Sequence, residues 1–423
     1  MPRTAHPPVG STYLSRRMLI LLGLGLASGL PLVLVSKLLT MWVSAAGMNV
    51  ERIGVLGLVT LPYSLKFVWS PVVDRYVPPI LGRRRGWMFF AQIGLIGGIA
   101  AMSLARPGAH LAAAALLVAT ISATQDIAID AFRTDLLLPE ERGPGAAIFV
   151  SGYRIGMLAP LLLLGVWPIS VPVLYRLCAG AIGIGMIATL AASEPAAAPP
   201  RTLADAIVHP LRQFLGRQAG WAILLVALIF KLPEYLAAAV SDKFLLGTLH
   251  FSLQDVGLIS GALGTGLTIA GAIIGGGIVE KIGAWRSLWI FGVLHSASNL
   301  AYLILSRTGP RHDVLIGVIA VENLCVGLTT AGFFAWMMGQ CDKRFSAFQY
   351  ALLSGLMALG RTAASPLAGW MAFHLGWTAF FGVSALLGVP GLLLLPWLRS
   401  DDFPGEPAAI ETAYTTVPAQ KVA

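Results

Sequence analysis

The chain has 423 residues, of which 57% are hydrophobic and only 12% are charged. Soluble globular proteins carry about 25% charged residues, so this composition excludes an ordinary soluble domain and indicates a membrane protein. The net charge of +9 does not indicate nucleic-acid binding, because the basic residues fall in short loops between apolar segments. Three cysteines and seven scattered histidines predict no disulfide framework, metal site or cofactor.

Twelve apolar segments follow one another along the chain, each near the length of about 20 residues that crosses a bilayer as a helix. The first begins after Arg16 and Arg17 and resembles a signal peptide, but further apolar segments follow it, so we interpret it as an uncleaved first helix. We therefore expect an all-α integral membrane protein with two six-helix bundles, in residues 1–192 and 219–399. The segments are 18–39, 53–69, 87–104, 111–132, 146–167 and 173–192, then 221–244, 256–279, 287–305, 314–338, 348–373 and 377–398.

Between the two bundles, residues 193–218 are rich in proline and alanine and contain a stripe of apolar side chains at helical spacing. This pattern favours an interfacial helix lying on the inner leaflet, although a simple linker explains the composition nearly as well. The polar residues 400–423 are expected to form a disordered cytoplasmic tail. The stripe consists of Leu203, Ile207, Val208, Leu211, Phe214 and Leu215.

The loop between the second and third apolar segments is strongly basic. A helix break expected at Pro71 is followed by an acid–base pair, Asp74 and Arg75, and by the arginines 83–85. Such a loop does not cross a bilayer, so we place it in the cytoplasm. Roughly eighteen basic residues lie in the termini and the even-to-odd loops against about six in the opposite loops, which predicts that both termini are cytoplasmic.

The two halves of the chain share short motifs at an offset of about 206 residues. Three matches at nearly one offset suggest a parallel duplication of six-helix units, which is the arrangement of the major facilitator fold. The matched pairs are Asp74-Arg75 with Glu280-Lys281, Ser36-Lys37 with Asp242-Lys243, and Arg154 with Arg361.

The fourth apolar segment carries Gln125, Asp126 and Asp130. The two carboxylates are four residues apart and therefore share one helix face, and Lys66 and Arg154 lie at comparable depth on other segments. A carboxylate between two cations stays ionised until a substrate draws a cation away, and it then takes up a proton. A static network of salt bridges is the alternative interpretation. Both interpretations remain open for Asp130, which is expected near the membrane edge. For Asp126 the cost of an ionisable group inside a bilayer favours the functional interpretation.

In the second half, Lys231 and Glu234 flank Pro233 and share a helix face. Arginine suits bidentate capture of carboxylates, and lysine forms a switchable pair with an acid. We expect a polar cluster at the interface of the halves, where transporters of this type hold their substrates. Its other candidates are Glu322, Asn323, Arg361, His295 and Asn299; for His295 a hydrogen-bonded packing role is the simpler interpretation. No catalytic motif such as HExxH or GxSxG is present, so we do not expect an enzyme.

Five strings in the chain are long enough to identify a family. They are WSPVVDRYVPPILGRRRGW, ATQDIAIDAFRTDLLLPEERGPGAAI, SGYRIGM, VENLCVG and CDKRFSAFQYALLSGLMALGR. These strings resemble the AmpG muropeptide permeases of the major facilitator superfamily, in the group that also holds the acetyl-CoA transporters, and the resemblance runs from Leu19 to Trp397. It implies proton-driven import of N-acetylglucosaminyl-1,6-anhydro-N-acetylmuramyl peptides across the inner membrane of a Gram-negative bacterium. It also implies peptidoglycan recycling and, where the regulator exists, β-lactamase induction.

The resemblance places the family's helix-4 amide and acids at Gln125, Asp126 and Asp130. The seventh segment departs from the family, reading Lys231-Leu-Pro-Glu234 where family members read Lys-Leu-Gly-Asp. The chain also lacks the additional C-terminal length of some members. These departures bear on the range of substrates more than on transport.

Together these observations predict roles for the buried and hinge residues. Arg154, Lys231 and Arg361 are expected to hold substrate carboxylates, with Gln125 and Asn323 bonding to sugar or peptide. The substrate site also includes Lys66, Tyr153 and Asn299. The proton carrier is expected to be Asp126, with Asp130, Glu234 and Glu322 as further candidates, and the cytoplasmic gate to be latched by Asp74, Arg75, Arg83, Arg84 and Arg85.

Two other functions remain open from the sequence. The cargo could be another bulky anion such as acetyl-CoA, although a nucleotide phosphate calls for more cavity-facing arginines than the chain offers. A transport-dead membrane sensor is the second alternative, and it would tolerate neutral substitutions of the buried charges. For the main prediction, muropeptide transport, the expected partners are a small anionic glycopeptide, protons and the lipid bilayer, with no nucleic acid, and the expected state is a monomer.

Overall fold

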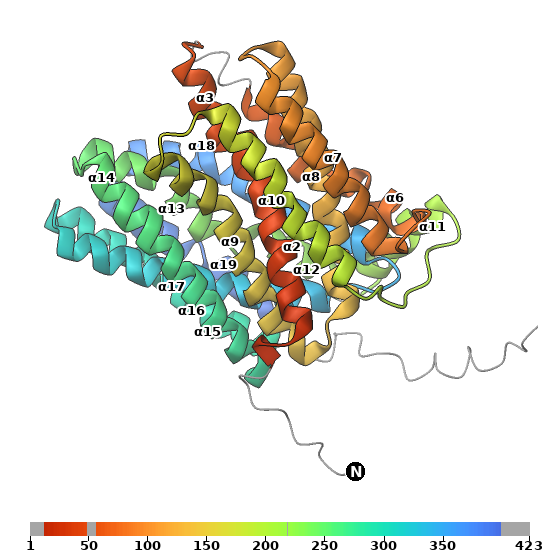
Figure 1. The fold of residues 1–423 in the computed structure, drawn as a ribbon. Coiled ribbons are helices and arrows are strands. Elements are labelled where there is room, and N and C mark those ends of the chain that lie inside the picture. The colour runs from red at the N-terminus through yellow and green to blue at the C-terminus, as the bar shows by residue number, and fades with distance from the viewer. Residues whose placement is uncertain (1–11, 49–55, 218, 399–423) are drawn as a thin grey trace, which may run out of the picture.

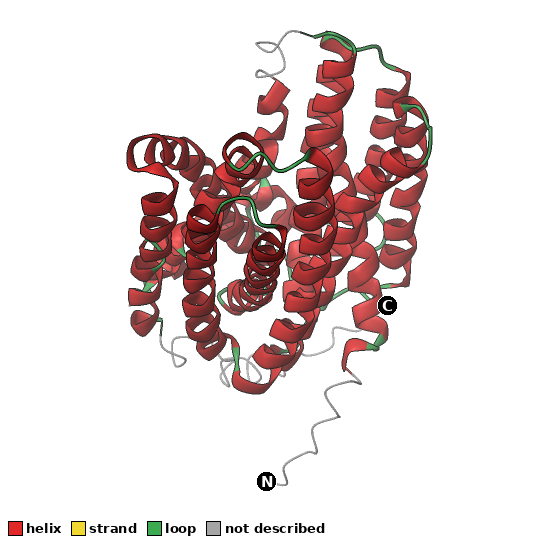
Figure 2. Cartoon of the chain, turned by 90° about the vertical axis from the view of Figure 1, so that its left-hand side faces the viewer, coloured by secondary structure: helices red, strands yellow, loops and turns green. Residues whose placement is uncertain are grey.

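The computed structural model describes residues 12–48, 56–217 and 219–398, and every regular element in these ranges is a helix (Figure 2). The first half contains α2 (Arg16–Val33), η1 (Leu34–Leu38), α3 (Leu39–Ala45), η2 (Gly57–Thr60), α5 (Leu61–Leu65), η3 (Lys66–Val68), α6 (Ser70–Arg75), α7 (Arg83–Leu104), α8 (Ala109–Leu136), η4 (Pro139–Glu141), α9 (Arg142–Val166) and α10 (Val171–Ala191). After α11 (Leu203–Leu215), the second half contains α12 (Gly220–Ile229), α13 (Leu232–Asp242), η5 (Lys243–Thr248), α14 (Leu253–Val256), η6 (Gly257–Leu263), α15 (Gly264–Ile282), α16 (Ala284–Thr308), α17 (His312–Gly339), α18 (Ser346–Leu386), α19 (Val389–Leu393) and η7 (Leu395–Trp397).

Ten helical stretches among the described residues are long and apolar enough to cross a membrane. The last of them, residues 346–397, is 52 residues long, about twice the length one crossing needs. Gly376, with φ of 74°, breaks it into two crossings. A further crossing consists of four short helices in succession, from η2 to α6. It is not among the ten because none of these helices is long enough by itself to cross a membrane. The expectation of about twelve spans in an all-α membrane protein is thereby confirmed.

Two predicted helices are interrupted where the sequence analysis expected continuous ones. The second is divided into η2, α5, η3 and α6, and Pro71 lies in the first turn of α6. A proline there begins a helix at no hydrogen-bonding cost. The helix is therefore interrupted at Trp69, two residues before the expected break at Pro71, and a new helix runs to Arg75. The predicted residues 53–55 lie outside the described ranges. The seventh helix is divided between α12 and α13, with Pro233 in the first turn of α13.

Glycines allow α2 and α9 to touch along their backbones. A Cβ added at Gly29 would lie 2.1 Å from the carbonyl oxygen of Tyr153, and one added at Gly152 would lie 2.3 Å from that of Leu22. The second half repeats this device between α15 and α17, where a Cβ on Gly271 would lie 2.2 Å from the Leu324 carbonyl oxygen. Small residues at such positions are the usual means of helix association in bilayers.

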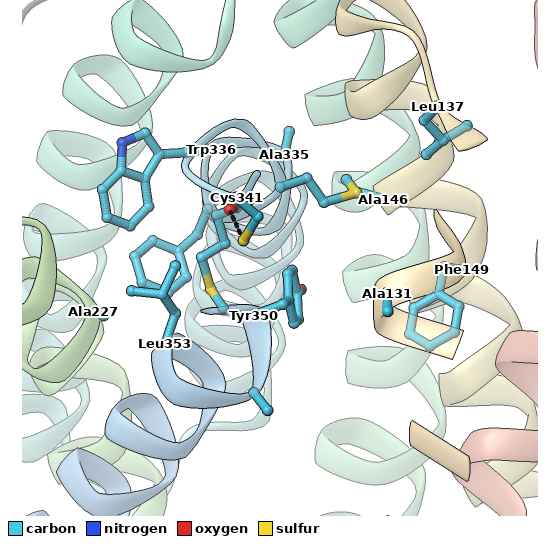
Figure 3. Packing of buried hydrophobic residues seen from close by; sticks show 14 of the residues in the cluster. Ala131, Leu137, Ala146, Phe149, Ala227, Ala335, Trp336, Cys341, Tyr350 and Leu353 are labelled. Atoms are coloured by element: carbon cyan, nitrogen blue, oxygen red, sulfur yellow. Dashed lines mark hydrogen bonds between the residues drawn. The ribbon is translucent and has the colours of Figure 1, made fainter. Parts of the chain in front are cut away.

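The halves meet on one side of the molecule and diverge on the other (Figure 1). We call the side that carries residues 76–82 and the start of α18 the hinge side, and the opposite side, which carries α3 and α14, the far side. Between the halves, α9 packs against α15 and α17, and α18 packs against α5, α6 and α8. One large apolar cluster joins residues of both halves, including Phe149 and Tyr350 (Figure 3), while two other clusters each lie within one half.

The predicted linker helix is present as α11. Thr202 and Asp205 form a capping box at its start. Of the predicted apolar stripe only Phe214 is buried, whereas Leu203, Ile207, Val208 and Leu215 are exposed. An exposed apolar face of this kind is available to a bilayer surface.

Candidate functional site

Arg84 is the centre of a buried ionic lock on the hinge side. Its Nη2 donates to Asp74 Oδ1 at 2.8 Å and its Nε donates to Asp135 Oδ2 at 2.8 Å. Nη2 also donates to Ser346 Oγ at 2.7 Å, in the first turn of α18. The lock therefore joins three elements of the first half to one of the second.

Asp74 additionally accepts backbone hydrogen bonds from the start of α18. The Ala347 N–H donates to Oδ1 at 3.3 Å and the Phe348 N–H donates to Oδ2 at 2.8 Å. The first N–H groups of a helix have no partner within the helix, and the helix dipole favours an anion beside them. Asp74 thus stabilises the end of α18 that contacts the first half.

The other predicted gate residues divide into two kinds. Arg83 crosses to the second half, donating to the carbonyl oxygens of Lys343 at 3.2 Å and Arg344 at 3.3 Å. Arg85 instead donates to the carbonyls of residues 189 and 190 in its own half, and Arg75 lies over the ring of its neighbour Tyr76. Asp135 belongs to the lock as well, although the sequence analysis did not select it.

Asp130 lies between two cations in the interior of the first half. Lys66 Nζ donates to Oδ2 at 3.0 Å and Arg133 Nη2 donates to Oδ1 at 2.7 Å, and all three residues are buried. The predicted arrangement of a carboxylate held between two cations is therefore present, but the second cation is Arg133 rather than Arg154. The sequence analysis missed Arg133 because it assigned that residue to the loop after the helix. Its position one turn after Asp130 was the available signal.

Asp126 has a different environment from Asp130. Ser28 Oγ donates to its Oδ1 at 2.6 Å, and no cation within the described residues forms an ion pair with it. The neighbouring Gln125 is buried, and its Nε2 donates to the Ala27 carbonyl at 3.2 Å. Both side chains therefore connect α8 to α2, and Asp126, unlike Asp130, has no ion-pair partner among the described residues.

In the second half, Lys231 lies at the break between α12 and α13. Its Nζ is 2.8 Å from Glu234 Oε2 and donates to Thr330 Oγ1 at 2.8 Å. His295 Nε2 is 3.9 Å from the same Glu234 oxygen, so it lies beside this pair. All of these side chains except Thr330 were selected from the sequence.

The remaining amides and Glu322 contact neighbouring helices. Asn299 Nδ2 donates to the Pro233 carbonyl at 3.1 Å, a group close to the helix break. Asn323 Nδ2 donates to the Ile319 carbonyl and its Oδ1 accepts from Thr268 on α15. Glu322 is buried and accepts a hydrogen bond from Tyr302.

Arg154 and Arg361 belong to opposite halves, and both lie close enough to Glu234 to interact with its charge. Each interacts electrostatically with Glu234 and with the other arginine. Arg361 is exposed and its Cζ lies 5.6 Å from the ring centroid of Tyr235. Arg154 and Tyr153 are half-buried on α9. Among the described residues, neither arginine has a carboxylate within ion-pair distance, so both charges are available to an anion.

Comparisons with known proteins agree with this architecture. Residues 53–352 match the model of the Major Facilitator Superfamily, and so do residues 244–421. The chain is 20% identical to the human organic anion transporter MFSD10, with a TM-score of 0.64 over 92% of this chain and 100% of that one. The proton:xylose symporter XylE is 11% identical, with the same TM-score over 92% of this chain and 95% of that one. At these identities the likeness shows the fold alone.

Sequence relatives are more specific. The anhydromuropeptide permease of Escherichia coli K12 is 44% identical over 388 residues, which are 90% of this chain and 79% of the relative. A Haemophilus influenzae protein named only as uncharacterized is 33% identical, covering 92% of this chain and 96% of its own. "Putative transporter AmpG 4" of Rickettsia felis is 28% identical over 89% of this chain and 95% of its own. The chain is a membrane transporter rather than an enzyme, and it belongs to the Major Facilitator Superfamily, within the family of the anhydromuropeptide permeases.

Proposed function

We propose that this protein imports anhydromuropeptides from the periplasm into the cytoplasm by proton symport, for the recycling of peptidoglycan. The cargo is a disaccharide of N-acetylglucosamine and 1,6-anhydro-N-acetylmuramic acid carrying a short peptide. Its peptide carboxylates are anionic and its sugars offer hydroxyl and amide groups. The observation that carries the proposal is the 44% identity to a permease of that name over 90% of this chain.

The charges at the interface of the halves support an anionic cargo. Arg154 and Arg361 come from opposite halves, and no carboxylate of the described structure neutralises them by an ion pair. A guanidinium binds a carboxylate through two parallel hydrogen bonds, so each arginine suits one carboxylate of a peptide. A cargo bound by residues of both halves also gains or loses contacts when the halves move relative to each other.

Proton coupling is assigned to Asp126. It is a carboxylate in the interior of a spanning helix, bonded to a serine hydroxyl rather than to a cation. Such a group can change its charge without first breaking an ion pair. Asp130, in contrast, would have to leave both Lys66 and Arg133 without a counter-charge.

The orientation follows from the basic loops. We propose that the hinge side is cytoplasmic, as the positive-inside rule predicts for the arginines 83–85, and that the far side faces the periplasm. The two bundles are then residues 1–192 and 219–399, joined by an interfacial α11 on the inner leaflet. In this orientation the lock of Asp74, Arg84 and Ser346 closes the cytoplasmic side. The working unit is proposed to be one chain.

Uptake of radiolabelled disaccharide anhydromuropeptide tests the proposal, in cells that lack their own permease and express this chain. Accumulation that a protonophore abolishes is the expected result. Uptake that persists with the protonophore would show that transport does not depend on the proton gradient, and another energy source would have to be sought. No uptake by protein that has reached the membrane would overturn the muropeptide assignment and direct the search to other bulky anions such as acetyl-CoA.

A further inference from the structure

Arg133 lies at the boundary between the two halves and is completely enclosed. It is on α8, its exposed fraction is 1%, and it donates to Asp130 Oδ1 at 2.7 Å. Its Nη2 also donates to the hydroxyl of Tyr350 on α18, which belongs to the second half. The residue therefore holds a charged group of the first half against a side chain that moves with the second.

Aromatic rings supply most of the remaining surroundings of the guanidinium. Its Cζ lies 4.3 Å from the ring centroid of Phe149, 4.8 Å from that of Tyr350 and 5.2 Å from that of Phe334. Its Nε and Nη1 have no hydrogen-bond partner within the described structure. A buried charge with unused donors is costly unless other groups compensate it, and the faces of aromatic rings attract cations.

The three rings come from different halves. Phe149 lies on α9 of the first half, whereas Phe334 and Tyr350 lie on α17 and α18 of the second. Figure 3 shows Phe149 and Tyr350 on facing sides of the same interface. If the halves separate on the hinge side, Arg133 keeps Phe149 and Asp130 but loses the other two rings and the hydroxyl. Water would then reach its free N–H groups.

We propose that Arg133 is a positioning residue of the transport cycle. It stabilises closure of the hinge side through Phe334 and Tyr350, and in doing so holds Asp130 and its partner Lys66 in place. The inference rests on the proposed transport function only in that a transporter alternates between closed and open hinge-side states. It links the charges inside the first half to the position of the second half.

The experiment measures the hinge-side opening directly, by spin-label distances in the full chain reconstituted in lipid nanodiscs without cargo. Labels are attached at Glu140→Cys and Arg286→Cys, two exposed positions on the hinge side of opposite halves. Cys341, the native cysteine that opening would expose, is replaced by serine for this measurement. Phe334→Leu removes a ring that leaves Arg133 when the halves separate. Phe149→Leu is the matched control, because it removes a ring that stays with Arg133 in both states.

The expected result is a ratio of closed to open molecules that falls by about two- to thirtyfold in Phe334→Leu, the range that a cation–π contact supports, and stays unchanged in Phe149→Leu. Arg133→Gln is expected to lower the ratio further, and Arg133→Lys to restore it in part, because lysine keeps the charge and loses the planar fork. Equal shifts in the two phenylalanine variants, or no shift in Arg133→Gln, would overturn the proposal.

Two features keep the experiment decisive. Tyr350→Phe removes only a hydroxyl group and is expected to lower the ratio of closed to open molecules as well. It replaces Phe334→Leu in the experiment if that variant does not fold. An unchanged ratio in well-folded Tyr350→Phe and Arg133→Gln would then overturn the proposal. Because no cargo is present, a failed uptake assay leaves these distances unaffected, so the two proposals fail separately.

Discussion

Asp74 and Phe348 are 274 residues apart in the chain, yet the Asp74 carboxylate accepts the Phe348 N–H at 2.8 Å. The bond places an anion of the first half at the N-terminus of a helix of the second. The same carboxylate pairs with Arg84, which contacts Ser346 two residues before Phe348. One buried carboxylate therefore contacts both a cation of its own half and the first backbone N–H groups of a helix in the other half.

Asp74→Asn is expected to open the hinge side, because an amide cannot match the charge that both Arg84 and the helix dipole favour. Hydrogen bonds to a charged group are worth about 1.5–3 kcal/mol, so we expect the open fraction to rise roughly tenfold or more. Cys341 supplies a native probe: it is buried on the hinge side, and burial raises the pKa of its thiol, which suppresses its reactivity. Its alkylation rate should rise in proportion.

Cys178 is the internal control for this measurement. It is buried within the first half alone, among side chains that do not separate when the halves move. A variant that accelerates alkylation of Cys341 and Cys178 alike has unfolded rather than opened. Unchanged alkylation of Cys341 would contradict the role of Asp74 in closure.

Arg154→Gln and Arg361→Gln are each expected to weaken cargo binding. Removing one charge-assisted contact to a carboxylate raises KM by about 10- to 100-fold while leaving the amount of protein in the membrane unchanged. Arg286→Gln, at an exposed position on the hinge side, is the matched control and should transport normally. Initial uptake rates over a range of cargo concentrations separate KM from the maximal rate. Wild-type KM in both variants would remove the arginines from the cargo site.

Asp342→Asn is expected to destabilise the loop between α17 and α18 in a pH-dependent way. Burial acts to raise the pKa of Asp342, but hydrogen bonds from the Arg344 side chain and backbone and from Gln213 hold it below its ordinary value of 3.8. When the pKa of a carboxyl group is lower in the folded state than in the unfolded state, its ionised form stabilises the fold. This added stability is fully present above the unfolded-state pKa and is lost as the pH falls through the folded-state pKa.

The variant should therefore melt about 1–2 °C below the wild type at pH 7, and this difference should be smaller at an acidic pH below 3.8. Thermal unfolding in detergent at the two pH values is the measurement, with Glu140→Gln, an exposed carboxylate, as the control. A difference that grows on acidification would have the wrong sign for this account.

Gly29→Ala is expected to disrupt the contact of α2 with α9, because its Cβ would lie 2.1 Å from the Tyr153 carbonyl oxygen. Overpacking of this kind costs about 1–3 kcal/mol. Gly97→Ala meets nothing within 4 Å and should be neutral. The yield of monodisperse protein and its melting temperature report the effect. Equal stability of the two variants would mean that α2 can shift at no cost.

The sequence predicted the number and order of the helices well, because bilayer-spanning segments are long and apolar and their basic loops are distinctive. It was less precise where backbone geometry decides the position of a helix break. Pro71 and Pro233 both lie in the first turn of a helix, a position that composition alone does not distinguish from a break in the middle of one.

The pairing of charges was harder to predict, because it depends on contacts between distant segments. The sequence singled out Lys66 and Asp130 but not Arg133, which lies at the end of an apolar segment and was counted as a loop residue. The Asp74–Phe348 bond involves a backbone N–H, which has no sequence signature. Lys231 and Glu234, only three residues apart, form an ion pair, but Lys231 lies at the helix break rather than on a shared helix face.

The central claim, import of an anhydromuropeptide coupled to protons, is tested most directly with purified protein in proteoliposomes. Labelled cargo is supplied outside, with and without an inward proton gradient, to the wild type and to Asp126→Asn. The account predicts accumulation above equilibrium only in the wild type and only with the gradient. Gradient-driven accumulation in Asp126→Asn would contradict the assigned proton carrier, and equal wild-type uptake with and without the gradient would contradict proton coupling.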